Sequence, residues 1–330
     1  MARVVLHIGT HKTATTAIQD FLARNREALA RQGIVYPALG PQSGHHGLMF
    51  TWHDLLPPSY RLPGSDDIWE TLSRQWADKD VTLLLSSEEF SRGYPSRVDM
   101  ADLRRRLSAF EEVRVICVLR NQAALLQSVY QEVSRQHKVP PIESYVNRSL
   151  AAGHASGVFL SHAALYDFLL EGFAPEEILL LSYEQEVAAP EGIIGRLLAH
   201  ASPAVDLAAL GSLEQSSNAS SPPAATLAAV RLAHPGIPEA WAFQMAAKVV
   251  QRVCGSEART SLLHSREVVA LHDAFAAEND ALVARRRDVQ PDFFLAPVAL
   301  RPETITRDKL GAQFWMQLAR ELYAASLSRP

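Results

Sequence analysis

The sequence predicts an α/β fold in which helices cover both faces of a mostly parallel sheet. Short apolar runs recur along the first half of the chain, and stretches with helical spacing lie between them. Such alternation is typical of βαβ units, which place their strands in parallel. The apolar runs are also continuous, as expected of strands buried on both faces. The expected strands are residues 4–8, 81–86, 113–119 and 178–181.

The first expected helix, residues 14–29, has two distinct sides. Ile18 and Leu22 lie on its apolar side, whereas Gln19 and Asp20 lie on its polar side. Ala-rich stretches predict further helices in the second half of the chain, where the Arg285–Arg287 run is interpreted as a solvated helix face. The other expected helices are 69–76, 123–136, 222–233, 238–253 and 267–287.

These elements predict one domain over residues 1–330. Its α/β core is expected over 1–190, and a mainly helical C-terminal cover over 191–330. Within the core, residues 33–64 are rich in Pro, Gly and His, and this stretch is expected to form an irregular excursion.

Composition narrows the class of protein. A hydrophobic fraction of 48% and a charged fraction of 21% are those of an ordinary globular protein. The net charge of −4 argues against general binding to nucleic acid or to an anionic membrane. No stretch approaches the ~20 apolar residues of a membrane span. Two isolated cysteines, Cys117 and Cys254, form neither a disulfide framework nor a zinc pattern, so we expect a cytoplasmic protein with Cys117 buried.

The loop between the first expected strand and the first expected helix predicts an anion site. The strand ends at Gly9, and Lys12 follows three residues later, ahead of the hydroxyl groups of Thr15 and Thr16. A strand-to-helix junction offers unpaired N–H groups and the positive end of a helix dipole. Lys12 adds a mobile positive charge. The alternative is a plain turn that carries a solvated lysine.

Neighbouring strand ends favour a second anion over a metal ion. The loop is not the phosphate-binding motif Gly-x-x-x-x-Gly-Lys-Ser/Thr, because only Gly9 precedes the lysine. The strand ends also lack the aspartate that would hold Mg²⁺ in nucleotide hydrolases of that class. The second strand instead leads into Glu88 and Glu89, and the third ends at Arg120. We therefore expect no metal site.

Two motifs resemble those of sulfotransferases. Residues 7–16 resemble that family's 5′-phosphosulfate-binding loop, commonly written Lys-Thr/Ser-Gly-Thr-Thr, with Ala14 in place of the usual glycine. Residues 118–130 are similar to its 3′-phosphate-binding strand and helix, in which a serine, here Ser128, follows the arginine, here Arg120, by eight positions. The resemblance covers residues 1 to about 190 and is closest to bacterial enzymes that sulfate carbohydrates or other small hydroxylated acceptors.

The resemblance implies an enzyme with a P-loop-like fold and a defined donor. The donor would be 3′-phosphoadenosine 5′-phosphosulfate, the product 3′,5′-adenosine bisphosphate, and the acceptor a hydroxyl of a carbohydrate or another small molecule. Lys12 would stabilise the departing phosphate, and Glu88 would be the general base. The residues expected to bind the donor are Gly9, His11, Lys12, Thr13, Ala14, Thr15, Thr16, Arg120 and Ser128.

Several alternatives stay open at this point. The base could be Glu89 or a histidine instead, and His45 and His46 are the next candidates, with His46 counted among the catalytic residues. Asn218 and Ser220 fall where some relatives place a loop over the nucleotide. The chain could also be a P-loop kinase or nucleotide hydrolase with a degenerate loop, or a nucleotide-binding protein without turnover. Neither the acceptor nor the oligomeric state is encoded in a readable pattern.

Overall fold

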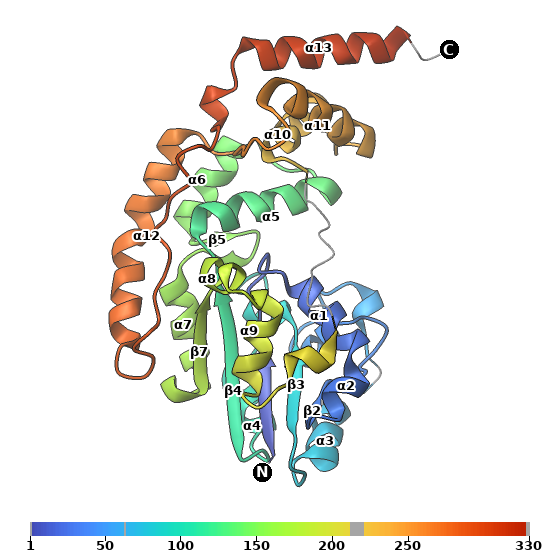
Figure 1. Ribbon diagram of the computed structural model, residues 1–330, viewed down its shortest axis with the longest axis vertical. Coiled ribbons are helices and arrows are strands. Elements are labelled where there is room, and N and C mark those ends of the chain that lie inside the picture. The colour runs from blue at the N-terminus through green and yellow to red at the C-terminus, as the bar shows by residue number, and fades with distance from the viewer. Residues whose placement is uncertain (1, 63, 212–220, 328–330) are drawn as a thin grey trace. The chain divides into compact units, whose positions relative to one another are not determined.

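The computed structural model contains a five-stranded sheet in the order β2-β3-β1-β4-β7 (Figure 1). Its four strand pairings are all parallel, which confirms the predicted parallel α/β architecture. The structure describes residues 2–62, 64–211 and 221–327. The strands are β1 (Arg3–His7), β2 (Ile34–Val35), β3 (Thr82–Ser86), β4 (Glu112–Leu119) and β7 (Ile178–Ser182).

Each of the four predicted strands is present, with bounds that differ by one residue at most at either end. The remaining strand, β2, lies inside the stretch that was expected to be irregular, residues 33–64. It pairs with β3 through only two residues, Ile34 and Val35. A run this short has no periodicity that distinguishes a strand from a loop.

Both faces of the sheet are covered, as predicted. In β1, Val4 and Leu6 belong to one apolar cluster and Val5 to another, because successive side chains of a strand point to opposite faces. Cys117 of β4 is buried in the first cluster. The first cluster includes residues of α3 (Ser65–Trp76), α4 (Met100–Arg106), α7 (His162–Leu170) and the end of α12 (Ser265–Arg286), and the second includes residues of α1 (Thr15–Arg24), α2 (Arg26–Ala30) and α9 (Gly192–Ala201).

The chain forms two compact units. The first comprises the described residues of 1–120, 157–216 and 278–296, and it holds the sheet. The second comprises those of 121–156, 217–277 and 297–330. Among the described residues, no helix is both long and apolar enough to cross a membrane. The first unit also contains β6 (Val158–Phe159), α8 (Tyr183–Ala188) and the 3-10 helices η1 (His46–Thr51), η2 (Pro58–Tyr60), η3 (Glu88–Ser91), η4 (Pro175–Glu177) and η5 (Leu207–Leu210).

The second unit is mainly helical. Its helix α10 packs against α5 and α11, and α11 packs against α13. The helices predicted in this part of the chain are present, and α6 and α13 are additional ones. Whether the unit acts as a cover stays a prediction. Its elements are α5 (Gln122–Gln136), α6 (Ile142–Ala152), β5 (His154–Ala155), α10 (Pro223–Ala233), α11 (Ala240–Cys254), the start of α12, η6 (Arg307–Lys309) and α13 (Ala312–Leu327).

The single helix expected over residues 14–29 is two helices. Helix α1 ends at Arg24 and α2 begins at Arg26. Between them, the side chain and the backbone N–H of Asn25 both donate to the carbonyl of Phe21, at 2.9 and 3.1 Å. Asparagine ends helices in this way because its amide competes with the helical backbone for hydrogen bonds.

The prediction that Arg285–Arg287 forms a solvated face is wrong for Arg286. The Arg286 side chain is buried, and its guanidinium donates to the carbonyls of Pro175 and Ile178 at 2.8 and 2.6 Å. It also donates to the hydroxyl of Tyr166 at 3.0 Å. One turn further on, the amide of Gln290 accepts from the N–H of Leu180 at 3.1 Å and donates to its carbonyl at 2.6 Å, along the free edge of β7.

We expect Arg286→Met to lower the free energy of unfolding by about 2 to 4 kcal/mol, because it leaves several buried oxygen acceptors without a donor. Urea denaturation measures this change. The neighbouring Arg285 is the matched control: it forms an ion pair with Asp167 and its side chain is 43% exposed. Arg285→Met should therefore cost less than about 1 kcal/mol. Equal effects of the two substitutions would show that the buried contacts of Arg286 are not stabilising.

Candidate active site

The loop that carries Lys12 lies at the carboxyl ends of the central strands (Figure 1). This is the edge of an open parallel sheet at which ligands bind. The loop is tied to β4 through Thr10, whose N–H and hydroxyl donate to the carbonyl of Val118 at 2.9 and 3.1 Å. Within the loop, the hydroxyl of Thr13 donates to the carbonyl of Thr10 at 2.5 Å, so this hydroxyl already has an acceptor.

Lys12 and Arg120, the two cationic residues that the sequence predicts at the anion site, are joined by a hydrogen bond within the first unit. Nη1 of Arg120 donates to the carbonyl of Lys12 at 2.7 Å. The Arg120 guanidinium also lies over the ring of Tyr183, with 4.9 Å between its central carbon and the ring centroid. Since both cations lie at the same sheet edge, each raises the affinity of that edge for an anion.

The start of α1 favours negative charge. Ala14 precedes the helix with φ 64° and ψ 22°, and no side chain caps the first turn. The first turn also contains no acidic residue. Thr15 is buried and Thr16 is exposed. The positive end of the helix dipole is therefore available to a phosphate-like group.

Glu88 lies directly against this loop. A Cβ placed on Gly9 would be 2.8 Å from Cβ of Glu88 and 3.1 Å from its Cα. Gly9 also has φ 79°, a conformation that other residues rarely adopt. Glycine at this position thus allows the loop and the residue that follows β3 to touch.

Sequence reasoning missed Gln19 as a site residue and placed it on the polar side of the helix, which is wrong. Its side chain is only 2% exposed, and Nε2 donates to Oε2 of Glu88 at 2.9 Å. One sequence signal was present: Gln19 lies four residues after Thr15, so both fall on the same face of α1.

His46 reaches Glu88 from the 33–64 excursion. Its Nδ1 is 2.8 Å from the hydroxyl oxygen of Ser87 and 3.9 Å from Oε2 of Glu88. Its ring stacks on that of Tyr60, with 4.8 Å between the centroids. The structure thus brings Glu88 and His46 together, as candidates for the same proton-transfer site.

His45 is held in a structural role instead. One ring nitrogen, Nδ1, accepts from the N–H of Ser86 at 3.0 Å, and the other, Nε2, donates to the carbonyl of Pro37 at 2.9 Å. Burial lowers the pKa of His45 to about 4, so the ring is neutral at physiological pH. Its two ring nitrogens connect the excursion to β3.

The two adjacent glutamates have different partners. Glu89 forms an ion pair with Arg92, with Oε2 2.5 Å from Nε and Oε1 3.1 Å from Nη2. Burial raises the pKa of Glu89, but its hydrogen bonds with Arg92, together with the charges of His11, Arg92 and His46, leave the pKa below its ordinary value. A carboxylate paired with a guanidinium is a weak proton acceptor.

The Glu88 carboxylate is held in its charged form. Burial raises its pKa, but nearby His11 and His46 and the hydrogen bond from Gln19 lower it further than burial raises it. His7 on β1 lies near Glu88, and its Nδ1 is 2.8 Å from the hydroxyl oxygen of Ser86. Burial lowers the pKa of His7 to about 4. Glu88 is therefore an anion and able to accept a proton at neutral pH.

Other predicted residues are not tested by this geometry. Ser128 lies in α5 of the second unit, so its pairing with Arg120 stays a prediction. Asn218 and Ser220 lie outside the described residues. Within the described part of the chain, no group of three or more His, Cys, Asp or Glu side chains is arranged to hold a metal ion.

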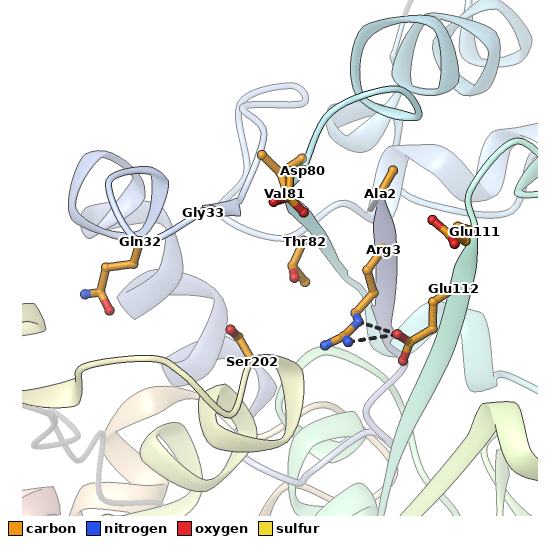
Figure 2. Close-up of a pocket in the computed structure, with 10 residues that line it drawn as sticks. All are labelled: Ala2, Arg3, Gln32, Gly33, Asp80, Val81, Thr82, Glu111, Glu112 and Ser202. Atoms are coloured by element: carbon orange, nitrogen blue, oxygen red, sulfur yellow. Dashed lines mark hydrogen bonds and ion pairs between the residues drawn. The ribbon is translucent and has the colours of Figure 1, made fainter.

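A pocket of about 370 Å³ lies at the opposite edge of the sheet, where the strands begin (Figure 2). Its arginine, Arg3, is bound to Glu112 at 2.8 Å, and two further carboxylates line it. This negative lining disfavours the anionic ligand that the loop at Lys12 attracts. The pocket is lined by Ala2, Arg3, Gln32, Gly33, Asp80, Val81, Thr82, Glu111, Glu112 and Ser202.

Two solved structures are similar to this chain. One, a sulfotransferase from Alicyclobacillus acidocaldarius, is 14% identical over 86% of this chain and 95% of that chain, with a TM-score of 0.46. The other, mouse sulfotransferase SULT7A1 complexed with PAP, is 10% identical over 88% of this chain and 89% of that chain, with a TM-score of 0.42. No family model matches the chain, and no curated protein matches its sequence.

We expect Ala14→Gly to raise the free energy of unfolding by about 0.5 to 1 kcal/mol. A left-handed conformation costs alanine about 1 to 2 kcal/mol, and the greater freedom of glycine in the unfolded chain offsets part of that gain. Urea denaturation measures the change. The control is Ala164→Gly, at an exposed position of helix α7, which should lower stability by about 0.5 to 1 kcal/mol. If both substitutions destabilise equally, Ala14 does not have a positive φ.

Proposed function

We propose that this chain is a sulfotransferase that moves a sulfuryl group from 3′-phosphoadenosine 5′-phosphosulfate to a hydroxyl of a carbohydrate or another small acceptor. One observation carries the proposal. An anionic glutamate, Glu88, touches the loop that carries Lys12 at the uncapped start of α1. A proton acceptor thus lies beside an anion site, which is the pairing that group transfer to a hydroxyl requires.

The residues present suit the donor. The 5′-phosphate would be bound by the first turn of α1, with Lys12 supplying charge and Thr15 and Thr16 supplying hydroxyl donors. Gly9, His11, Thr13 and Ala14 complete this loop. Arg120 would bind the 3′-phosphate together with Ser128, because the planar guanidinium suits phosphate oxygens.

The proposed reaction is a displacement at sulfur. Glu88 takes the proton of the acceptor hydroxyl, and the acceptor oxygen forms a bond to sulfur. The bond between sulfur and the bridging phosphate oxygen breaks, and its electron pair leaves with the 5′-phosphate. Lys12 and the N–H groups at the start of α1 stabilise that added negative charge. His46 is the second candidate for the proton acceptor, at 3.9 Å from Glu88.

We expect 3′,5′-adenosine bisphosphate to bind equally well with Mg²⁺ and with a chelator, as measured by calorimetry, because the proposed contacts are to side chains and N–H groups. Lys12→Ala should weaken this binding about tenfold or more, the loss of one charged contact. The control is Lys79→Ala, since Lys79 stacks on Trp76 before β3 begins. Mg²⁺-dependent binding of ATP in place of the bisphosphate would indicate a kinase or hydrolase.

We expect Glu88→Gln to lower kcat for sulfate transfer by about 10² to 10⁴, the usual contribution of a general base. Affinity for 3′,5′-adenosine bisphosphate should not change. The assay uses labelled donor and a panel of sugars and phenols as acceptors. Glu89→Gln tests the neighbouring carboxylate and should reduce kcat much less. A larger loss for Glu89→Gln or for His46→Gln would assign the base to that residue.

A further inference from the structure

We propose that Gln19 is a positioning residue for the base, whose side-chain amide holds the Glu88 carboxylate through Oε2 in the orientation that takes the proton of the acceptor. This inference rests on the proposed function, in which Glu88 is the base. Gln19 donates to Oε2 at 2.9 Å, and Nδ1 of His46 lies 3.9 Å from the same oxygen.

Helix α1 fixes the position of the Gln19 backbone. The helix begins directly after the Lys12 loop, and Ile18 and Leu22 anchor it in an apolar cluster of the sheet. The flanking Asp20 is exposed, whereas Gln19 is 2% exposed. A buried amide needs a hydrogen-bond partner, and the Glu88 carboxylate is the partner that the structure provides. The helix that presents the anion site therefore also orients the base.

The backbone of Gly44 lies close to the other side of the Gln19 side-chain amide. A Cβ placed on Gly44 would lie 2.5 Å from Oε1 of Gln19 and 2.8 Å from Nε2 of His46. The φ of Gly44 is not positive, so glycine is needed here for space and not for backbone conformation. Gly44 thus packs closely against both Gln19 and His46, the two side chains that lie beside Oε2 of Glu88.

A neutral donor suits this task better than a cation. Glu89, one residue along, is bound by the guanidinium of Arg92, which holds that carboxylate but lowers its basicity. An amide restrains the carboxylate through a weaker hydrogen bond, since only one partner is charged. Gln19 therefore restrains the orientation of Glu88 without placing another positive charge on its carboxylate.

The test must separate Gln19 from the other groups around Glu88. These are His7 on β1, His11 in the loop, and Tyr36 and His46 in the excursion. Because Gln19 has no titrating group, substituting it removes a hydrogen bond without removing a charge. Gln19→Met keeps the length of the side chain and removes the donor.

Carbon-13 NMR of the Glu88 carboxyl, assigned by the loss of its signal in Glu88→Gln, measures the effect on the intact protein. We expect Gln19→Met to raise the pKa of Glu88 by about one unit, the shift expected from losing a hydrogen bond to a charged group. Gln19→Glu should raise it further, because a second carboxylate disfavours the charged form. Gln32→Met, at the opposite edge of the sheet, is the control and should change nothing.

Kinetics supply the second readout. Gln19→Met should lower kcat about tenfold, a loss equivalent to one misplaced hydrogen bond. The KM for the donor and the affinity for 3′,5′-adenosine bisphosphate should stay within twofold. As the pH falls, the rate is lost when Glu88 gains a proton, so this loss should begin at a higher pH in Gln19→Met than in the wild type.

Two results would overturn the inference. An unchanged Glu88 titration in both Gln19 variants would show that the amide does not hold the carboxylate. A rise in the donor KM that matches the fall in kcat would make Gln19 a donor-binding residue. If the wild-type protein neither binds 3′,5′-adenosine bisphosphate nor transfers sulfate, the proposed function fails by itself, and the NMR titration still decides whether Gln19 holds Glu88.

Discussion

The candidate site depends on a close contact between two strand ends. Gly9 follows β1 and Glu88 follows β3, and the two residues approach so closely that a single added carbon would not fit. Parallel pairing of β1 with β3 brings these ends to the same sheet edge. Thr10 then ties the loop to β4, on the other side of β1. The anion site and the proton acceptor are neighbours because the sheet order makes their strands neighbours.

Sequence patterns predicted the sheet well because its signals are local. Continuous apolar runs mark strands buried on both faces, and four strands were located in this way. The two-residue strand β2 gave no such signal, since its position depends on pairing with β3. The apolar spacing over residues 14–29 is unbroken, so it gave no sign of the break at Asn25. That break depends on the hydrogen bond from the Asn25 side chain to the carbonyl of Phe21. Arg286 was misassigned because its acceptors lie about 110 residues away.

The candidate site residues that the sequence selected were selected for the same reason. Lys12 and Glu88 follow expected strands, and Thr15 and Thr16 lie at the start of an expected helix, so position along the chain was enough to select them as candidates. Gln19 and the separate roles of His45 and His46 depend on how the 33–64 excursion folds back over the sheet edge. The helical spacing of apolar residues placed Gln19 on the solvent-facing side of α1. That spacing carries no information about which other segments of the chain pack against the helix. Neighbouring histidines likewise look equivalent until their partners are known.

The amide of Gln290 has a consequence for association. Strand β7 is an outer strand of the sheet, and an outer strand exposes backbone groups that another molecule can pair with. At Leu180, Gln290 occupies both the N–H and the carbonyl, as a neighbouring strand would. Arg286 occupies the carbonyl of Ile178 two residues earlier. Side chains thus form hydrogen bonds with the outward-facing backbone groups of β7. They protect this edge strand from pairing with a strand of another molecule.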